Sequence, residues 1–532
     1  MSGSGPPGEG IGAVSEPAPD FDDIAQCVRR HAVRAPTQPA LVLGQHSLSY
    51  AGLDRRMDQV ACALQSDGLG PGDTIAICAA MAIDYVTIFL GALRAGLAVA
   101  PLAPGSGAQG LTRMVADAQA RCVFVDADSA GLFEVASGTG PVCIAIDGND
   151  GHGTLADWLR DAIPPSRDVA IQPEWPFNII YSSGTTGTPK GIVQSHRMRW
   201  THVRRGATYG YGRDTVTLLS TPLYSNTTLV VFCPTIARGG TVMLMPKFDA
   251  CGYLELAQQH RVTHTMLVPV QYQRLMALPE FDHFDLSSFR FKFSTSAPFA
   301  AALKADVLAR WPGGLVEFYG LTEGGGTCIL DAHRDAAKLH TVGMPAQGHD
   351  IRLIDDNDVE VAPGEAGEVV GHSPGMMTGY HGQPEKTREA EWFDLQGKRF
   401  IRTGDIGRFD ADGFLILLDR KKDMVISGGF NVYPSDLEAV LRQHPAVADV
   451  AVVGVPSERW GETPVAFVVA HDATSTSAAE LLQWVNIRLG KTQRLADLQL
   501  LAELPRSPIG KVLKRALRAA YAPTSNLEAP SP

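Results

Sequence analysis

The feature that most constrains the fold is the alternation of strand-like and helix-like segments over residues 21–150. The segment DTIAICAA at 73–80 is predicted to be a buried strand, and YVTIFLGALRAG at 85–96 is predicted to be a helix that ends at a glycine. The apolar run CVFVD at 122–126 again has the pattern of a strand. Alternation of this kind predicts parallel sheets that are covered by helices.

The pattern changes twice further along the chain. Turns and short strands dominate residues 343–418, which predicts a β-rich subdomain. After Arg420 a compact unit follows, in which Ser435 and Glu438 form a capping box that predicts the start of a helix. We therefore expect an α/β protein with a large N-terminal domain of layered subdomains and a small mobile α+β C-terminal domain. The predicted boundaries are a disordered leader at 1–20, a large domain at 21–420, a small domain at 421–521 and a tail at 522–532.

Composition narrows the class of protein. The net charge of −11 disfavours nucleic acid as a partner. The eight cysteines form no C-x-x-C pair and lie mostly in apolar runs, so we expect buried thiols rather than disulfides or zinc ligands. The N-terminus lacks the pattern of a signal peptide, and no apolar run reaches membrane-spanning length, which predicts a cytoplasmic protein without integral membrane association. A homodimer is left open.

The stretch YSSGTTGTPKG at 181–191 is rich in glycine and hydroxyl groups and contains one lysine. Such a loop can surround an anion with backbone N–H groups, hydroxyls and a cation. It is not a Walker P-loop, because Gly184 and Gly187 are too close together and Gly191 follows Lys190 where serine or threonine is required. The structural alternative is a flexible hairpin turn.

Several further stretches accompany this loop, in a fixed order. They are LRAGLAVAPLAP, STSAP, EFYGLTEGGG, RTGDIGRF, DRKKDMVISGGFNVYP, ERWGETPVAFVV and PRSPIGKVLKRALR. Together with the loop they resemble the motifs of the adenylate-forming superfamily, which comprises acyl-CoA synthetases, non-ribosomal adenylation domains and firefly-type luciferases. The resemblance extends over about residues 25 to 520 and is strongest to stand-alone AMP-forming acyl-CoA synthetases.

The resemblance implies a binding site for ATP and Mg²⁺. The phosphates would be bound by Ser182, Ser183, Gly184, Thr185, Thr186, Gly187 and Lys190. The adenosine would be bound by Ser296, Ala297, Pro298, Tyr319, Asp405 and Arg420. Tyr319 would stack on adenine, Asp405 would accept hydrogen bonds from the ribose, Thr322 would contact the α-phosphate and Glu323 would ligate Mg²⁺. Ser296 and Asp419 replace residues that are usually glycine in the family; the Ser296 change is expected to be tolerable.

Three further implications concern the C-terminal domain. Lys511 would bridge the attacking carboxylate and the α-phosphate, and its structural alternative is a solvated lysine beside a basic helix. Lys422 would be the hinge about which the small domain rotates after adenylation. Ser427, Gly428 and Gly429 would then line the channel for coenzyme A.

The identity of the acid is the least constrained feature. The acyl pocket is expected at Tyr224, Ser225 and Asn226, where the absence of an aspartate disfavours an amino acid, and at Gly324 and Gly325, which are expected to leave room for a bulky or flat group. Medium-to-long fatty acids and aryl or arylpropenoic acids remain open, and no arginine for a second carboxylate is identifiable. His196 is expected to be structural.

The predicted activity is ATP-dependent ligation of a carboxylate to coenzyme A. The alternatives are an acyl-AMP ligase that loads a carrier protein, a luciferase-like oxidative enzyme and a non-catalytic nucleotide-binding protein. The combination of Lys511, Glu323 and Asp405 argues against the last of these.

Overall fold

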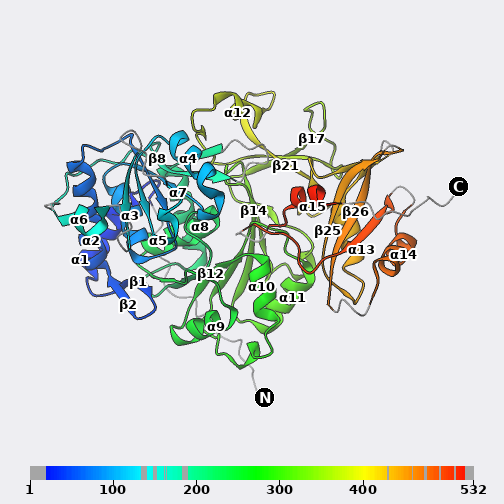
Figure 1. The fold of residues 1–532 in the computed structure, drawn as a ribbon, viewed down its shortest axis with the longest axis horizontal. Helices are drawn as coiled ribbons and strands as arrows, with labels where there is room; N and C mark the ends of the chain where they lie inside the picture. The colour runs from blue at the N-terminus through cyan, green and yellow to red at the C-terminus, as the bar shows by residue number, and fades with distance from the viewer. Residues whose placement is uncertain are drawn as a thin grey trace, which may run out of the picture.

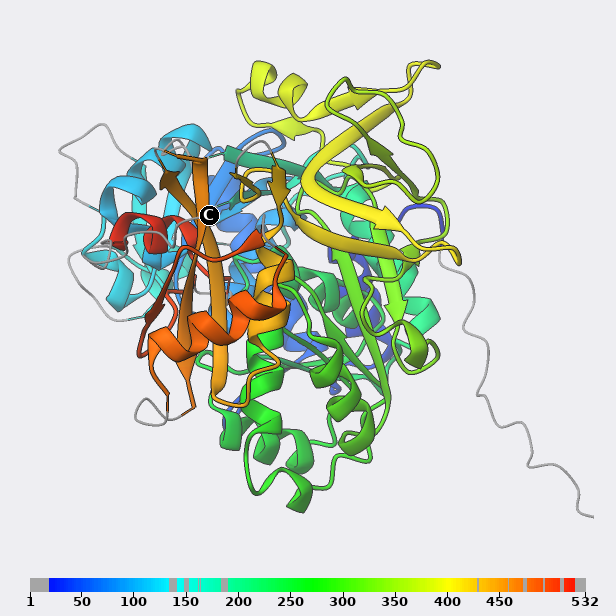
Figure 2. The same ribbon diagram turned by 90° about the vertical axis from the view of Figure 1, so that its right-hand side faces the viewer.

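The computed structural model describes residues 19–133, 141–147, 153–160, 162, 164–182, 190–427, 430–457, 459–471, 476–490, 493–507 and 511–521. This part of the chain contains two large sheets, a smaller sheet and the sheet of a C-terminal unit (Figure 1). Figure 2 looks onto the C-terminal unit, which lies in front of the large sheets and is coloured orange to red. The predicted α/β class with a large domain and a small C-terminal domain is confirmed.

The first large sheet has the strand order β19-β9-β8-β4-β3-β5-β6-β7. Its strands are β3 (Thr74–Cys78), β4 (Ala98–Pro101), β5 (Ala120–Val125), β6 (Val142–Ala145), β7 (Gly153–Thr154), β8 (Pro176–Ser182), β9 (Lys190–Ser195) and β19 (Gly379–Tyr380). Strands β4, β3, β5 and β6 are parallel, and every residue of β3 is buried. A central parallel strand is covered on both faces, which explains the unbroken apolar run in the sequence.

The second large sheet has the order β16-β15-β14-β13-β12-β10-β11-β1-β2. Its strands are β1 (Pro39–Leu43), β2 (His46–Ser49), β10 (Val216–Leu219), β11 (Thr241–Leu244), β12 (His264–Leu267), β13 (Phe291–Ser294), β14 (Gly314–Gly320), β15 (Thr327–Asp331) and β16 (Met344–Pro345). The strands from β11 to β14 are parallel, so the carboxyl ends of β13 and β14 lie side by side. This edge positions the candidate site.

Helices form three layers around the two large sheets. The layer between the sheets consists of α1 (Ile24–Arg34), α2 (Tyr50–Ser66), α3 (Ile83–Arg94), α7 (His196–Gly206) and α8 (Asn226–Ala237). Outside the first sheet lie α4 (Gly107–Asp117) and α5 (Ala127–Ala130), and outside the second lie α9 (Ala250–Gln259), α10 (Pro269–Met276) and α11 (Ala301–Arg310). The short helix α6 (Leu155–Arg160) contacts α2. Both sheets thus share one apolar core.

The predicted β-rich subdomain is confirmed as an antiparallel sheet. It contains β17 (Asp350–Ile354), β18 (Gly367–His372), β20 (Glu391–Phe393), β21 (Arg399–Phe409) and β22 (Leu415–Arg420), with α12 (Pro384–Glu389) connecting β19 to β20. The register of β21 and β22 places Asp405 opposite Arg420.

The C-terminal unit is a small sheet with helices on both faces. Its elements are β23 (Val425–Ser427), β24 (Phe430–Val432), α13 (Pro434–Leu441), β25 (Val447–Ser457), β26 (Gly461–Ala470), α14 (Ala478–Arg488), β27 (Asp497–Leu500) and α15 (Lys514–Ala520). Helices α13 and α14 cover one face and α15 covers the other, each over an apolar cluster.

The predicted capping box of α13 is wrong. The helix begins one residue before Ser435, whose hydroxyl donates to the carbonyl oxygen of Leu418. Glu438 instead accepts the N–H of Val452 at 2.9 Å and pairs with Lys514 at 3.1 Å. Tertiary partners therefore replace the local capping that the sequence suggested.

The described residues bear on two compositional expectations. Six of the eight cysteines are buried, but Cys143 is half-buried and Cys251 is exposed, so the expectation of a buried thiol is wrong for Cys251. None of the described helices combines the length and apolarity that crossing a bilayer requires.

Candidate active site

The glycine-rich loop joins two antiparallel strands. Ser182 at the end of β8 pairs with Lys190 at the start of β9, so the loop leads from strand to strand and no helix N-terminus follows it. Ser183, Gly184, Thr185, Thr186 and Gly187 lie outside the described residues, as does the side chain of Ser182. The anchor of the loop is therefore described, whereas the predicted phosphate contacts stay a prediction.

Lys190 and Glu323 approach the same tyrosine. The ammonium of Lys190 lies 5.1 Å from the ring centroid of Tyr380, and the Tyr380 hydroxyl donates to Glu323 Oε1 at 2.9 Å. Burial raises the pKa of Tyr380, and the Glu323 carboxylate adds to the shift, so the hydroxyl remains a donor. Sequence reasoning missed Tyr380, because it lies on β19, far along the chain from either motif.

Tyr319, Asp405 and Arg420 form a second connected group. The Tyr319 hydroxyl donates to Asp405 Oδ2 at 2.8 Å, and Arg420 Nε lies 2.6 Å from Asp405 Oδ1. Burial raises the pKa of Asp405, and the Arg420 guanidinium opposes that shift. The three residues come from β14, β21 and β22, so the predicted adenosine residues of two different sheets meet here.

The STSAP segment follows β13 and contacts both β14 and α8. Thr295 Oγ1 donates to the carbonyl oxygen of Phe318 at 2.7 Å. Ser296 has a φ of 82°, in the left-handed region that favours glycine, and its Oγ lies 2.6 Å from Thr227 Oγ1. This conformation explains why glycine is usual at the position. The expectation that serine is tolerable there did not include the cost of the strained backbone. The hydrogen bond between Ser296 and Thr227 offsets that cost in part. Ala297 is half-buried and Pro298 is exposed.

Lys511 reaches this group from the far end of the chain. Its backbone N–H donates to Ser507 Oγ at 3.2 Å. Desolvation and the charge of Arg420 lower the pKa of the Lys511 ammonium, whereas the carboxylates of Asp405 and Glu323 oppose the shift. The residue is exposed to solvent, but its charge lies within electrostatic range of both carboxylates. Its contact with the reacting groups stays a prediction.

The segment around Lys422 connects the two domains by a tight turn. The N–H groups of Asp423 and Met424 donate to the Arg420 carbonyl oxygen at 2.9 and 3.0 Å. Asp419 Oδ2 accepts the N–H of Ser435 at 2.9 Å, which ties β22 to the first turn of α13.

Beyond this turn, Ser427 ends β23 and pairs with Gly461. Gly428 and Gly429, the other predicted channel residues, lie outside the described residues.

A buried polar network supports Thr322, and sequence reasoning missed it. Gln194 Nε2 donates to the Thr322 carbonyl oxygen at 2.6 Å. Arg199, fully buried, donates to the Gln194 side chain, to Asn178 Oδ1 at 2.9 Å and to Asn226 Oδ1 at 2.6 Å. Burial lowers the pKa of Arg199 to about 10. The network links a predicted catalytic residue to a predicted acyl-pocket residue.

The predicted acyl-pocket residues of α8 have structural contacts. Ser225 Oγ caps α8 by accepting the Thr227 N–H at 3.3 Å, and the Asn226 side chain is held by Arg199. Tyr224 is half-buried. His196, which was expected to be structural, is buried with its ring centroid 5.1 Å from that of Phe177.

The expectation that Gly324 and Gly325 leave room for an acyl group is wrong. A β-carbon added at Gly324 would lie 1.9 Å from the Gly375 carbonyl oxygen, and one added at Gly325 would lie 2.4 Å from the β-carbon of Ile401. The backbone of Gly375 already occupies the space beside Gly324, and the side chain of Ile401 occupies the space beside Gly325.

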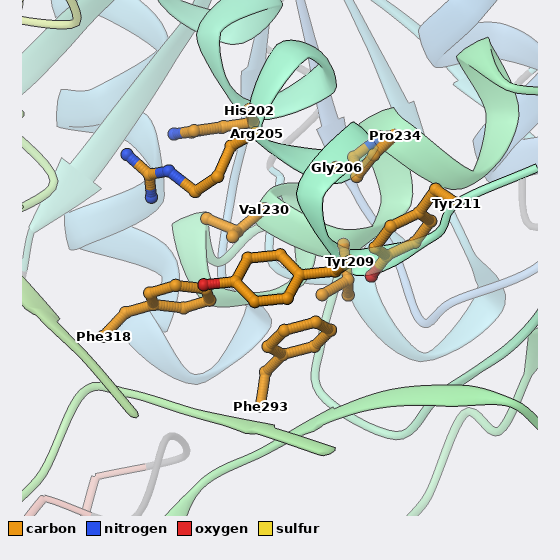
Figure 3. Close-up of a pocket in the computed structure, with 10 residues that line it drawn as sticks. His202, Arg205, Gly206, Tyr209, Tyr211, Val230, Pro234, Phe293 and Phe318 are labelled. Atoms are coloured by element: carbon orange, nitrogen blue, oxygen red, sulfur yellow. The ribbon is translucent and has the colours of Figure 1, made fainter. Parts of the chain in front are cut away.

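A narrow hollow lies instead between α7, α8, β13 and β14, and its lining is aromatic (Figure 3). The ring of Phe293 stacks on that of Phe318 with centroids 5.5 Å apart, and Tyr209 meets Phe293 edge-on at 5.1 Å. His202 and Arg205 of α7 complete the lining opposite these rings. Phe318 and Tyr319 are consecutive on β14 and face opposite sides of the sheet: Phe318 packs into the core between the two large sheets, and Tyr319 packs against the β-rich subdomain.

Comparison with known proteins places this geometry in a family. The model of the AMP-binding enzyme family matches residues 28–381, and that of the AMP-binding enzyme C-terminal domain matches residues 436–511. A feruloyl-CoA synthase of an Amycolatopsis species is 33% identical, covering 92% of this chain and 98% of that protein. The fatty acid–[acyl-carrier-protein] ligase ScoC of Streptomyces coeruleorubidus is 31% identical, covering 94% and 96%. The structure of ATP-bound MatB from Rhodopseudomonas palustris has a TM-score of 0.81 at 29% identity, covering 93% of this chain and 99% of that chain.

The chain belongs to the AMP-binding enzyme family. More particularly, it is an enzyme of the adenylate-forming superfamily and lies near the AMP-forming acyl-CoA synthetases, as its motifs predicted.

Proposed function

We propose that the protein is an ATP-dependent carboxylate–CoA ligase. The carboxylate attacks the α-phosphate of ATP, which gives an acyl-adenylate and releases pyrophosphate; the thiol of CoA then displaces AMP. The observation that carries the proposal is the connected group of Tyr319, Asp405 and Arg420 in a chain of the AMP-binding enzyme family. Lys511 would act beside this group, because its charge is coupled to those of Asp405 and Glu323. A cation held there stabilises two anions that otherwise repel as they approach.

The remaining residues bind and orient ATP. Lys190 and the hydroxyl-rich loop bind the leaving pyrophosphate, Tyr319 binds adenine and Asp405 accepts hydrogen bonds from the ribose. Among the described residues no cluster of three or more potential ligands could hold a metal ion by itself. Mg²⁺ takes one or two carboxylates together with phosphate oxygens, and Glu323 is the carboxylate that would hold it. When bound, Mg²⁺ neutralises phosphate charge.

The second half-reaction requires a different arrangement of the C-terminal unit. Rotation about Lys422 would withdraw Lys511 and bring Ser427, Gly428 and Gly429 to the reacting centre. The single covalent connection through a tight turn is compatible with such a rotation.

An exposed aromatic group supports CoA as the thiol. Trp460 is 48% exposed, and the guanidinium of Arg459 lies 4.7 Å from its ring centroid. Both residues directly precede Gly461, the partner of Ser427. An aromatic ring beside an arginine suits the adenine and phosphates of CoA. A carrier protein is the second candidate acceptor, because the similar ScoC is a ligase for an acyl-carrier protein.

The acid is an aromatic or arylpropenoic acid or a medium-to-long fatty acid. The similarity to a feruloyl-CoA synthase favours the aromatic class.

The test is acid-dependent AMP release with ATP and either CoA, pantetheine or a carrier protein as acceptor. We expect Trp460→Ala to raise KM for CoA but not for pantetheine, which lacks the nucleotide. Trp484→Ala is the matched control, because Arg488 lies over Trp484 at 3.8 Å on the same unit. AMP release with the carrier protein but not with CoA would refute CoA as the acceptor, and no release with any acceptor would refute the ligase.

A further inference from the structure

Arg199 of α7 is a fully buried cation whose three hydrogen-bond partners are neutral amides. Its Nε donates to Asn178 Oδ1 at 2.9 Å, and its two terminal nitrogens donate to Asn226 Oδ1 at 2.6 Å and to the Gln194 side chain. No carboxylate in the described part of the chain forms an ion pair with it. A charge that is buried without an opposite charge is costly for a protein to keep, so its presence calls for an explanation.

The three amides belong to elements that carry predicted nucleotide and acyl residues. Asn178 of β8 and Gln194 of β9 lie opposite each other in the hairpin that ends in the glycine-rich loop. Gln194 Nε2 donates to the Thr322 carbonyl oxygen at 2.6 Å, and Asn226 is the first residue of α8. One cation therefore joins the base of the phosphate loop, the Thr322 segment and the N-terminus of α8.

Stability alone does not account for a cation in this place. Because Asn226 begins α8, the guanidinium lies beside the positive end of that helix, where a cation is disfavoured. The charge also acts beyond its own partners, since burial and Arg199 together hold the pKa of His202 well below its usual value. The interior thus keeps a positive potential, which an anion bound beside Thr322 would offset.

We propose that Arg199 is a positioning residue for ATP: it fixes the Thr322 segment through Gln194, and its buried charge strengthens binding of the phosphates. The proposal rests on the proposed function, in which Thr322 contacts the α-phosphate. Only the Gln194 amide group separates the guanidinium from the Thr322 carbonyl. At an effective dielectric constant of about 20, a unit charge about 10 Å from another changes its affinity by about tenfold.

The test measures the binding of ATP and of adenosine by calorimetry, without any acid present. Asn226→Asp keeps the oxygen that accepts from Arg199 and places a negative charge against the cation. We expect the affinity for ATP to fall by about tenfold, whereas the affinity for adenosine, which has no phosphate, should stay unchanged. The midpoint of thermal unfolding should not fall, because the new carboxylate pairs with a buried cation at a helix N-terminus.

Two further variants separate the charge of Arg199 from its structural contacts. Arg199→Gln removes the charge and keeps a hydrogen-bond donor, so it should lower the affinity for ATP to a similar extent, although it unfolds at a lower temperature. Arg197→Gln is the matched control, because it makes the same change in net charge on the same helix. Arg197 is exposed and pairs with Glu174, so both affinities should stay at the wild-type value at about 0.15 M salt.

Two results would overturn the proposal: a wild-type affinity for ATP in Asn226→Asp, or equal losses for ATP and adenosine in that variant. The second result would show that the network acts through structure alone. If Arg199→Gln does not fold, Asn226→Asp decides. Absence of ATP binding by the wild-type protein would instead refute the proposed function, and with it this inference. ATP binding that none of the variants weakens would refute the role of Arg199 alone.

Discussion

Asp419 is placed to hold the C-terminal unit in the orientation that brings Lys511 to the site. It lies just before Lys422, and its Oδ2 accepts the N–H of Ser435 at 2.9 Å. Ser435 lies in the first turn of α13, so the carboxylate sits at the N-terminus of that helix, where an anion is stabilised. We predict that Asp419→Ala destabilises this orientation of the C-terminal unit and leaves the orientation used for thioester formation unaffected.

The magnitude follows from the bond that is lost. A hydrogen bond to a charged group contributes about 1.5–3 kcal/mol. Its loss would shift the equilibrium between the two orientations by roughly 10- to 100-fold. If the present orientation is the one that adenylates, ATP–pyrophosphate exchange should fall by up to that factor. Thioester formation from supplied acyl-adenylate should be unchanged or faster, because it uses the other orientation.

Two variants serve as controls. Asp419→Asn keeps an oxygen that can accept the Ser435 N–H, so exchange should stay near the wild-type rate. Asp423→Asn removes a charge on the other side of Lys422, but its partner is Arg518 of the same unit, at 2.8 Å. Equal losses in both half-reactions of Asp419→Ala, or a larger loss in either control, would refute the reasoning.

Three further predictions concern stability. Arg199→Met should lower the free energy of unfolding by about 3–5 kcal/mol, because the amide oxygens of the buried Asn178 and Gln194 and of the half-buried Asn226 lose their charged donor, at about 1–3 kcal/mol for each buried acceptor left unpaired; urea titration measures this. Burial lowers the pKa of His264 to about 4. Between pH 4 and 6.5 the His264 imidazole is therefore protonated in the unfolded state only. The free energy of unfolding should fall as the pH drops through that window, by up to about 1.4 kcal/mol per pH unit. His264→Gln should remove this part of the pH dependence. Ser296→Ala should destabilise more than Ser296→Gly, because alanine keeps the strained φ and both lose the bond to Thr227.

Each of these has a clear contrary result. An Arg199→Met variant with the wild-type urea midpoint would show that the network contributes nothing. An identical pH slope in His264→Gln would exclude that histidine as a contributor. Greater stability of Ser296→Ala than of Ser296→Gly would show that the backbone there is unstrained.

The layered α/β fold could be predicted because its signals are local. The unbroken apolar run of β3 reflects burial on both faces, and the capping of α2 by Ser49 is encoded within a few residues. The start of α13 was mispredicted because Ser435 has partners on β22, outside its own segment. Local patterns carry no information about such contacts.

The residues of the candidate site also fall into two groups: those that local motifs reveal and those that only tertiary packing reveals. The nucleotide residues were identifiable because their motifs are contiguous and occur in order. Tyr380 and Arg199 were not, since each acquires its position only when separate elements pack together. Gly324 was misinterpreted because a glycine in a sequence does not reveal whether ligand or backbone fills the space beside it.

The central claim is that Lys511 drives formation of the acyl-adenylate. The most direct test is ATP–pyrophosphate exchange by Lys511→Ala, with thioester formation from supplied acyl-adenylate measured on the same preparation. We expect exchange to fall by about 100-fold or more for removal of one stabilising charge, while thioester formation is largely retained. Exchange at the wild-type rate in Lys511→Ala would contradict the claim.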